Sequence, residues 1–312
     1  MRRRAYSYAW VVFGATFATL LLAAGFRSSP GVLIDPLQDE FGWTKADIGL
    51  AVSVNVLLFG LMGPFAAALL ARFGLRRVVS LALLATAAGA GLTPFVNHLW
   101  QLVLLWGVVV GAATGCMATV LAATVANRWF VARRGMVTGA LTAATASGQL
   151  VFLPLFERFV DGPGWRWVSY TVAAGALLAV PFVVLFVRNK PEDVGQVAYG
   201  APPGWKTPPP PSNPIRHAIG GLASLRRTGA FWLLFGSFAV CGLSTNGLIQ
   251  THFISAAHDH SIAHPATLLA MIGVFDVVGT LASGLLTDRY DPRRLLFAYY
   301  GLRGVSLLLL QP

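Results

Sequence analysis

Ionisable side chains stand inside or at the ends of long apolar runs in this sequence of 312 residues. Arg27 closes the first run, Asp276 lies midway along a later run, and Arg303 lies roughly 13 Å into the last run if that run is helical. A charge at bilayer depth is costly, so each of these residues is a default hypothesis for function. A guanidinium offers two parallel donors to a carboxylate, and a carboxylate can accept a proton. We interpret Arg27 and Arg303 as candidate binders of an organic anion and Asp276 as a candidate proton acceptor.

Each of these residues also has a structural interpretation. Arg27 could extend its charged head to the outer lipid headgroups while its stem stays in the apolar region. Asp276 and Arg303 stand at similar depth on consecutive apolar runs, so they could form a structural ion pair. The residues by themselves leave both alternatives open.

Uncharged polar residues in the apolar runs extend the set of candidates. His252 stands beside Gln250 and Asn246, and an imidazole can carry a proton at physiological pH, or it can be a hydrogen-bonded group near the outer edge. Asn55 and Gln149 could line a cavity or make packing hydrogen bonds between helices. We count Asn55 and Gln149 among the substrate-binding candidates and His252 among the proton-coupling candidates.

Other kinds of chemistry have no pattern in the sequence. There is no Gly-rich phosphate loop, no paired cysteines and no His-Glu zinc spacing, so we expect neither an enzyme nor a cofactor or metal. His258, His260 and His264 lie close together, but without fixed helical spacing they do not define a metal site. The two cysteines, Cys116 and Cys241, fall in apolar runs and are interpreted as small packing residues.

The composition indicates that the solvent of this chain is the lipid bilayer. Apolar residues make up 56% of the sequence and charged residues 11%, against roughly 25% in soluble domains. A helical span needs about 20 mostly apolar residues. Nine runs qualify, namely Tyr8–Phe26, Gly49–Leu70, Val78–Val96, Leu99–Ala126, Met136–Phe156, Trp167–Val187, Phe231–Ser255, Ala266–Thr287 and Leu295–Leu310.

The basic residues favour one orientation of these spans. With the N-terminus in the cytoplasm, 18 of the 23 lysines and arginines fall in cytoplasmic segments, as the positive-inside rule requires. The net charge of +11 therefore reflects topology, and no nucleic-acid partner is expected. We predict a multi-pass protein of the inner (plasma) membrane with a cytoplasmic N-terminus.

A charged hairpin occurs twice, each time between two apolar runs. The second copy reads Gly284-Leu-Leu-Thr-Asp288-Arg289-Tyr-Asp-Pro-Arg293-Arg294. The first copy, 217 residues earlier (71 against 288), reads Ala67-Ala-Leu-Leu-Ala71-Arg72-Phe-Gly74-Leu-Arg76-Arg77. The arginines suit headgroups or solvent, and the Asp288 carboxylate can accept hydrogen bonds from a neighbouring helix end. The repeat predicts two homologous membrane halves.

The halves are separated by a stretch of different composition. We predict an N-terminal six-helix half over 1–187, a cytoplasmic linker over 188–228 and part of a second half over 229–312. The linker is polar and includes Pro208–Pro211, which favours extended, solvated backbone. Six spans, a linker and three spans form an incomplete symmetry, so we expect a truncated or partial form of a twelve-span protein.

The two hairpins resemble the loop signature of the major facilitator superfamily, which lies between helices 2 and 3 and again between helices 8 and 9. The resemblance implies a gating loop built from Arg72, Gly74, Arg76, Arg77, Gly284, Asp288, Arg289, Arg293 and Arg294. The first copy has Ala71 where the family has an Asp, and the second has Asp291 where a glycine is usual.

Further stretches resemble the monocarboxylate and oxalate–formate exchanger branch. They are Gly25-Phe26-Arg27-Ser28, Arg128-Trp129-Phe130 with Arg133-Arg134-Gly135, Gly164-Trp165-Arg166 and Pro191-Glu192-Asp193-Val194-Gly195. The resemblance implies that Arg27 stands where monocarboxylate transporters carry a lysine implicated in proton and substrate binding, and that Asp276 stands at their eighth-helix aspartate. Thr280 occupies the position of their arginine four residues later, so Arg27 or Arg303 must supply the positive charge for an acid. Thr280 joins the substrate-binding candidates.

These observations together predict an all-α membrane protein with a major facilitator fold and about nine of its twelve helices. The function implied by the resemblance is secondary active transport of a small organic anion, a carboxylate, by alternating access with proton symport or exchange. The alternatives are an exporter of drugs or metabolites and an inactive truncated membrane protein. The expected partners are a small-molecule substrate and the lipid bilayer, and the expected state is a monomer.

Overall fold

The computed structural model describes residues 7–117, 119–202, 205, 214–242, 244–245 and 265–308. Throughout these residues the ordered elements are helices, and the strand-like pairing is limited to one isolated bridge between Phe130 and Tyr199. The predicted all-α class is therefore confirmed.

Among the described residues, six helical segments are long and apolar enough to cross a membrane. The first joins α1 (Tyr8–Ser28) to α2 (Pro30–Phe41), the second is α3 (Lys45–Phe73), and the third is α4 (Leu75–Leu92) with η1 (Thr93–Phe95). The fourth runs through α5 (Leu99–Leu102), the π-helix η2 (Val103–Val110), α6 (Gly111–Met117) and α7 (Thr119–Trp129). The fifth is α8 (Arg134–Asp161) and the sixth is α9 (Arg166–Phe186). Each of the six apolar runs predicted for the first half corresponds to one of these helical segments.

Local sequence signals set the boundary between the first two spans. Gly42 has a φ of 68° and ends α2, in a conformation that glycine adopts without steric cost. Thr44 then begins α3 with a capping box. Its Oγ1 accepts a hydrogen bond from the Asp47 N–H at 3.2 Å, and the Asp47 carboxylate accepts one from the Thr44 N–H at 3.0 Å.

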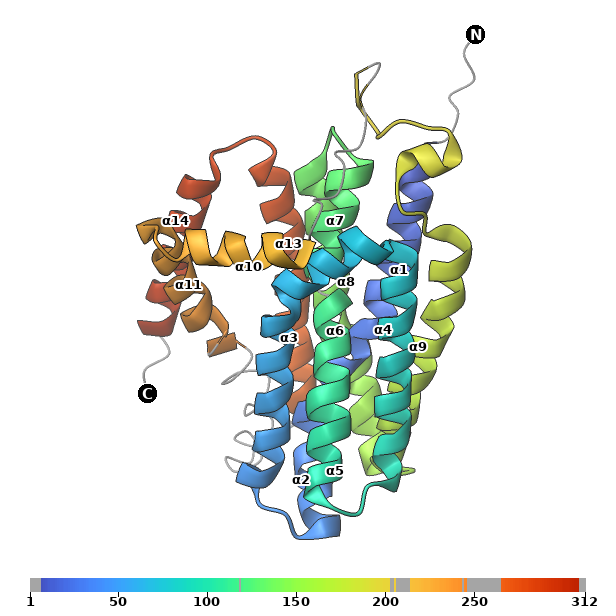
Figure 1. Ribbon diagram of the computed structural model, residues 1–312. Coiled ribbons are helices and arrows are strands. Elements are labelled where there is room, and N and C mark those ends of the chain that lie inside the picture. Colours follow the sequence, from blue (N-terminus) through green and yellow to red (C-terminus); the bar gives the residue numbers. More distant parts are fainter. Residues whose placement is uncertain are drawn as a thin grey trace.

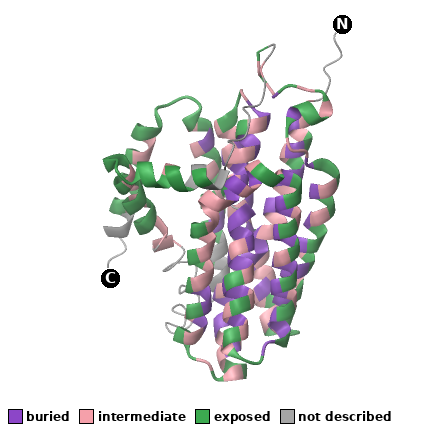
Figure 2. Cartoon of the chain, in the orientation of Figure 1, coloured by how far each residue is buried: buried purple, intermediate pink, exposed green. Residues whose placement is uncertain are grey.

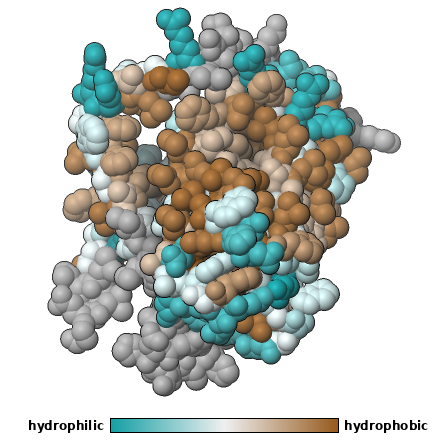
Figure 3. Space-filling view, turned by 60° about the horizontal axis from the view of Figure 1, so that its bottom comes forward, coloured by the Kyte–Doolittle hydropathy of each residue, from teal (hydrophilic) through white to brown (hydrophobic). Residues whose placement is uncertain are grey.

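The six spans lie side by side in one bundle (Figure 1). Helix α1 packs against α8 and α9, α4 packs against α9, and α3 packs against α6. Buried residues gather where these helices face one another (Figure 2). Figure 3 shows apolar side chains over the side of the bundle and polar ones at the end that faces the viewer. Apolar sides with polar ends are what a bilayer requires of a spanning bundle.

Small residues let the fourth span approach α3 closely. A Cβ atom added at Gly111 would lie 2.9 Å from the Asn55 Cα, and one added at Gly115 would lie 2.8 Å from the Phe59 carbonyl oxygen. Small residues on one helix face are a common means of packing helices within membranes. Glycine spacing therefore fixes how the fourth span lies on the second.

The linker predicted over 188–228 is ordered at both of its ends. Near its start, the Val131 N–H donates to the Tyr199 carbonyl at 2.9 Å, the Tyr199 N–H donates to the Trp129 carbonyl at 2.8 Å, and Ala198 is buried. Farther along, α10 (Pro214–Leu225) is a helix that contacts α3. The expected extended backbone is therefore wrong for these parts, because Tyr199 is hydrogen-bonded to the backbone after α7 and Pro214–Leu225 is helical. Pro208–Pro211 lie outside the described residues.

Beyond the linker, the described helices are α11 (Gly229–Gly242), α13 (Pro265–Thr287) and α14 (Pro292–Leu308). Helix α13 packs along α8 of the first half, whereas α11 and α14 lie farther from the bundle (Figure 1). The predicted runs Ala266–Thr287 and Leu295–Leu310 match α13 and α14, and the run Phe231–Ser255 is described mainly over α11. Helix α13, with 23 residues, is as long as a membrane span, and Gly229–Gly242 and Met271–Thr287 are the apolar helical stretches found among the described residues of this part.

Candidate functional site

A small hollow of about 80 Å³ lies inside the first half, between α1, α3, α6, α7 and α8. Its walls are apolar except for three threonines, and two of their hydroxyls bond to backbone. Thr114 Oγ1 donates to the Val110 carbonyl at 2.7 Å, and Thr145 Oγ1 donates to the Thr142 carbonyl at 2.6 Å. Such bonds use the hydroxyl proton and leave oxygen lone pairs for another donor. The lining residues are Leu20, Ala23, Ala24, Phe59, Thr114, Met117, Thr119 and Thr145.

Three predicted substrate-binding positions lie one helical turn from this hollow. Arg27 and Gln149 come four residues after the lining residues Ala23 and Thr145, and Asn55 comes four residues before Phe59. Four residues on a helix return to nearly the same face about 6 Å along the axis. Since consecutive spans alternate in direction, the first and fifth spans run one way and the second the other. The three positions therefore lie on the same side of the hollow.

Arg27 lies within a nearly continuous helix. Helix α1 ends at Ser28 and α2 begins at Pro30, with Ser29 between them in helical conformation. The Ser29 N–H donates to the Phe26 carbonyl at 3.2 Å and its hydroxyl donates to the same carbonyl at 2.8 Å. The helix thus passes the arginine position with little interruption, so Arg27 falls within the continuous helical segment Tyr8–Phe41.

Asn55 makes a hydrogen bond between two spans. Its Nδ2 donates to the Trp106 carbonyl at 2.7 Å, and Trp106 belongs to the π-helix η2. A π-helix pairs residues five apart, so a neighbouring side chain can bond to a carbonyl that the wider turn frees. The packing hydrogen bond, one of the two alternatives for Asn55, is therefore present.

Asp276 and Arg303 have different neighbours. Asp276 is exposed, and its Oδ1 accepts a hydrogen bond from Thr280 Oγ1 at 3.4 Å. Arg303 donates to Cys241 Sγ at 3.2 Å and to Thr245 Oγ1 at 2.7 Å, and it also bonds to Ser244. These hydrogen bonds of Arg303 join α14 to the end of α11. Within the described part of the chain the ion pair is that of Glu40 with Arg166, and the alternative pair of Asp276 with Arg303 does not form.

His252 lies outside the described residues, as do the neighbouring Gln250 and Asn246. Its candidacy as a proton carrier stays a prediction. The same holds for the nearby histidines at 258, 260 and 264. In the described part of the chain, no group of His, Cys, Asp and Glu is arranged to hold a metal ion.

The second charged hairpin joins the two halves. The Asp288 carboxylate accepts hydrogen bonds from the Gly135 N–H at 2.8 Å and the Met136 N–H at 3.0 Å, at the N-terminus of α8. The first N–H groups of a helix lack partners within the helix, and a carboxylate there also meets the positive end of the helix dipole. The bonds expected between Asp288 and a neighbouring helix end are present.

Glycines allow this contact to form. A Cβ atom at Gly135 would lie 2.5 Å from Asp288 Oδ1, and one at Gly139 would lie 2.8 Å from the Gly284 Cα. A Cβ at Gly284 would lie 2.7 Å from the Gly135 carbonyl oxygen. Helices α8 and α13 therefore meet backbone to backbone, at a distance that larger side chains would prevent.

The first charged hairpin is capped from elsewhere in the chain. Gly74 has a φ of 84°, and a Cβ atom there would lie 2.5 Å from Asn189 Oδ1. The same oxygen accepts a hydrogen bond from the Arg76 N–H at 3.3 Å, at the start of α4. Arg128 donates to the Asn189 carbonyl at 3.3 Å and to the Leu70 carbonyl at 3.4 Å. Asn189 therefore caps α4, and sequence reasoning missed it because its only signal is that it precedes the Lys190-Pro191 turn.

The arginines of both hairpins are exposed, as expected for groups at a headgroup layer or in solvent. Arg72 also places its guanidinium 5.3 Å from the centre of the Phe73 ring. The exposed set comprises Arg72, Arg76, Arg77, Arg289, Arg293 and Arg294.

A second polar cluster lies at the opposite end of the bundle. Glu40 of α2 forms an ion pair with Arg166 and accepts a hydrogen bond from Trp165 Nε1 at 2.6 Å. The Arg166 guanidinium also lies 4.9 Å from the centre of the Trp165 ring. This outer clasp, made of Glu40, Trp165 and Arg166, ties the first span to the sixth.

The model of the Major Facilitator Superfamily matches residues 15–310, which is nearly the whole chain. The chain belongs to the major facilitator superfamily. The resemblance read from the two charged hairpins is thereby confirmed, and the chain is a multi-pass membrane protein of a transporter family.

Curated relatives include bacterial and animal proteins. An uncharacterized MFS-type transporter, YcxA of Bacillus subtilis, is 22% identical over 96% of this chain and 71% of its own length. Human monocarboxylate transporter 6 is 29% identical over 91% of this chain, and mouse monocarboxylate transporter 11 is 26% identical over 96%. The chain spans 57% and 64%, respectively, of the length of these two relatives.

Solved structures of the superfamily share the fold. The proton:xylose symporter XylE, bound to 6-bromo-6-deoxy-D-glucose, superposes with a TM-score of 0.63 at 15% identity, covering 93% of this chain and 71% of that one. A partially occluded inward-open form of XylE from E. coli gives a TM-score of 0.62 at 14% identity, over 93% and 75%. At these identities the likeness shows the major facilitator fold and nothing about substrate.

Proposed function

We propose that this major facilitator protein is a secondary active transporter of small organic anions, with carboxylates as its substrate class. It works as a monomer in the inner membrane, with its N-terminus in the cytoplasm. The relatives named monocarboxylate transporters support this substrate class. Transport follows from alternating access, in which two halves move against each other around a central site.

One observation carries the proposal, namely that three polar residues lie at the same depth along the bundle. Arg27, Asn55 and Gln149 belong to three different spans, yet each lies one turn to the same side of the hollow in the first half. A cation with two amide-bearing residues at one level suits a carboxylate, because a guanidinium supplies paired donors and amides add further ones. The apolar hollow one turn farther would receive the rest of a small acid.

The contact between α8 and α13 supplies the inner gate of this proposal. Asp288 caps α8 across the boundary between the halves, and Gly139 meets Gly284 there. A rocking motion that opens the pathway toward the cytoplasm must break these bonds, and one that closes it must remake them. The hairpin arginines then stay with the headgroups while the helices move.

Proton coupling is assigned to Asp276 in this proposal. Its carboxylate is exposed on α13, beside the hydroxyl of Thr280, so protons and substrate can both reach it. Asp276→Asn should make uptake independent of an imposed proton gradient while leaving exchange in place. An unchanged response to the gradient would show that Asp276 carries no coupled proton.

Uptake into proteoliposomes tests the assignment of Arg27. Labelled small carboxylates are added to vesicles that contain the protein, with and without an imposed proton gradient. Arg27→Gln should lower uptake by at least about tenfold, since a charge-assisted paired contact is worth about 1.5 to 3 kcal/mol. Arg158→Gln, at the outer end of α8, is the matched control and should transport normally. Equal uptake by both variants would refute the role of Arg27.

A second candidate function is export of lipophilic compounds. It is favoured by the walls of the hollow, where the side chains other than the three threonines are apolar. An exporter would bind cationic lipophilic molecules, which the positive charges of Arg27 and Arg303 would repel. Competition between labelled carboxylates and a lipophilic cation in the same vesicles separates the two functions, because only an exporter is inhibited by the cation.

A further inference from the structure

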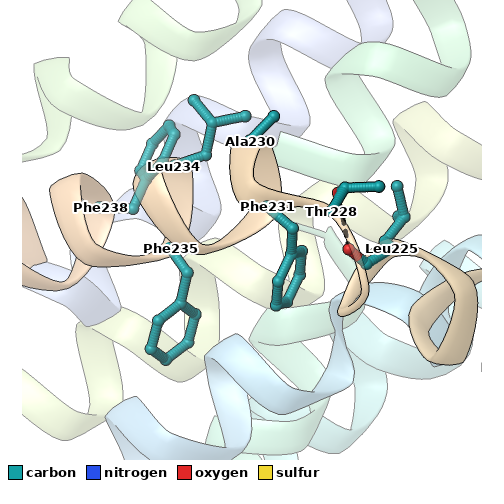
Figure 4. A pocket seen from close by; sticks show the side chains of 7 residues that line it. All are labelled: Leu225, Thr228, Ala230, Phe231, Leu234, Phe235 and Phe238. Atoms are coloured by element: carbon teal, nitrogen blue, oxygen red, sulfur yellow. Dashed lines mark hydrogen bonds between the residues drawn. The ribbon is translucent and has the colours of Figure 1, made fainter.

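An apolar groove runs along the surface of α11, outside the hollow discussed above. It has a volume of about 280 Å³ and is lined by Leu225, Thr228, Ala230, Phe231, Leu234, Phe235 and Phe238. Figure 4 shows Phe231 and Phe235 on one side of the helix and Ala230, Leu234 and Phe238 on the other. These are two neighbouring ridges of residues four apart, and the groove is the space between them.

The turn before α11 closes one end of the groove and carries two adjacent cations. Thr228 Oγ1 donates to the Leu225 carbonyl at 2.7 Å, and the Thr228 N–H donates to the same carbonyl at 2.9 Å (Figure 4). Arg226 and Arg227 lie in this turn and are exposed. Trp232 donates its indole N–H to the Arg226 carbonyl at 2.8 Å, which fixes the turn against the helix. The arginine pair therefore stands at one end of the groove.

Helix α10 and the turn before α11 have the features of a segment at the membrane interface. Helix α10 lies across the bundle, near the level of the turn between α3 and α4 (Figure 1), and it exposes the apolar side chains of Ile219 and Leu222. A helix that lies crosswise with an apolar stripe is typical of the membrane interface, and tryptophan is enriched there. From Thr228 to Phe238 the groove follows α11 for about 15 Å, which is half the thickness of the hydrocarbon core. The groove thus reaches the depth of one leaflet.

We propose that the groove on α11 binds one acyl chain of an anionic phospholipid of the cytoplasmic leaflet, whose phosphate is held by Arg226 and Arg227. An acyl chain fits a groove with apolar walls that begins at the interface and ends at mid-membrane. Two adjacent guanidiniums select an anionic headgroup over a zwitterionic one, because the latter carries its own cation. This site is separate from the transport pathway and does not depend on the substrate assigned above.

Lipid titration of the purified 312-residue chain, read by native mass spectrometry, tests the headgroup. The probes are phosphatidylglycerol and phosphatidylcholine with the same acyl chains. The intact chain should retain one phosphatidylglycerol in preference to phosphatidylcholine. The double variant R226Q/R227Q should lose about thirtyfold of its affinity for phosphatidylglycerol and none for phosphatidylcholine. The matched control R293Q/R294Q removes the same charge from a different exposed arginine pair and should keep the preference.

A second pair of variants tests the groove without changing charge. Ala230→Phe adds a ring at one of the residues that line the groove and should abolish retention of both lipids. Leu233→Phe, on the same helix but outside the lining residues, should leave retention intact. Equal retention of the two lipids by the intact chain would overturn the proposal. Retention of phosphatidylglycerol by R226Q/R227Q, or a cross-link from a cysteine at position 230 to another protein helix, would overturn it as well.

Discussion

The two charged hairpins begin from the same sequence pattern and reach helix capping by different routes. In the α13–α14 hairpin, Asp291 accepts a hydrogen bond from the Arg293 N–H at 2.8 Å and so caps its own helix. In the α3–α4 hairpin the corresponding residue is Gly74, and Asn189 from beyond the sixth span supplies the cap. The repeat thus preserves a satisfied helix N-terminus rather than a particular side chain.

The two hairpins also differ in what they hold together. Asp288 bonds to α8 of the other half, whereas its counterpart in the first hairpin is Ala71, which has no side-chain acceptor. The first half closes its own core, with fully buried side chains such as Trp129 and Phe156. Among the residues of 214–305 whose burial is described, the buried ones are Gly273 and Gly284. The second hairpin therefore attaches a thinly packed region to a well-packed one.

The largest loss of stability is expected where α8 and α13 approach each other most closely. Gly139→Leu would push a side chain into the Gly284 backbone and should cost about 3 kcal/mol, as overpacking does at well-packed sites. Equilibrium unfolding in mixed detergent micelles measures the loss. Gly279→Leu on α13 is the matched control, because a Cβ atom there meets nothing within 4 Å. If both variants unfold alike, the α8–α13 contact does not depend on these glycines.

The next largest loss of stability is expected at Gly74, beside the Asn189 cap of the first hairpin. Gly74→Ala combines a positive φ with a clash against Asn189 and should cost about 2 kcal/mol. Gly42→Ala, at a φ of 68° with open space around it, measures the backbone contribution alone. In an Asn189→Ala background, the cost of Gly74→Ala should fall toward that of Gly42→Ala. A cost unchanged by Asn189→Ala would mean that the cap is not what requires a glycine at position 74.

The two aspartates of the second hairpin should separate capping within a half from capping between halves. Asp288→Ala and Asp291→Ala should each cost about 1 kcal/mol, the usual loss for a helix cap. Only Asp288→Ala should weaken the contact between α8 and α13, which a cysteine pair across the two helices reports through its rate of cross-linking. Equal cross-linking in both variants would remove Asp288 from the gate.

The smallest effect is expected at the outer clasp of the first half. Arg166→Gln breaks the ion pair with Glu40, but the arginine side chain is 46% exposed, so solvent screening limits the cost to less than about 1 kcal/mol. Thermal unfolding at low and high salt measures it, and the difference from the unmodified chain should shrink as salt rises. Glu157→Gln is a comparison that leaves the clasp intact. A cost that does not change with salt would mean that Arg166 acts through packing.

Much of the fold was predictable because its signals are local. Apolar runs of sufficient length predicted the spans of the first half, and the repeated hairpin predicted both the superfamily and the bonds of Asp288 to a helix end. The partner of Asn55 and the cap on α4 could not be predicted. Asn55 bonds to a residue 51 positions away, and the cap on α4 comes from a residue 113 positions away. Sequence patterns of this kind report which residues lie on a face, and contacts between distant elements follow only from packing.

The candidate site was predictable only in part for a related reason. Depth along a span can be counted in residues, so Arg27, Asn55 and Gln149 could be assigned to spans from the sequence. That they share one level beside a hollow depends on how three spans slide along one another. The partners of Arg303 depend on the end of α11, where the predicted run gave no helix boundary.

The π-helix η2 allows the fourth span to tolerate the deletion of one residue, which a regular α-helix does not. Deleting one residue from an ordinary helix rotates everything beyond the deletion onto a different face. Within Val103–Val110 the wider turns already hold one residue more than an α-helix of the same length would, so a single deletion there would restore regular pitch and keep both ends facing as before. The fourth span therefore contains one residue that it could lose without changing which faces its two ends present. Asn55 bonds to the carbonyl of Trp106 within that π-helical segment.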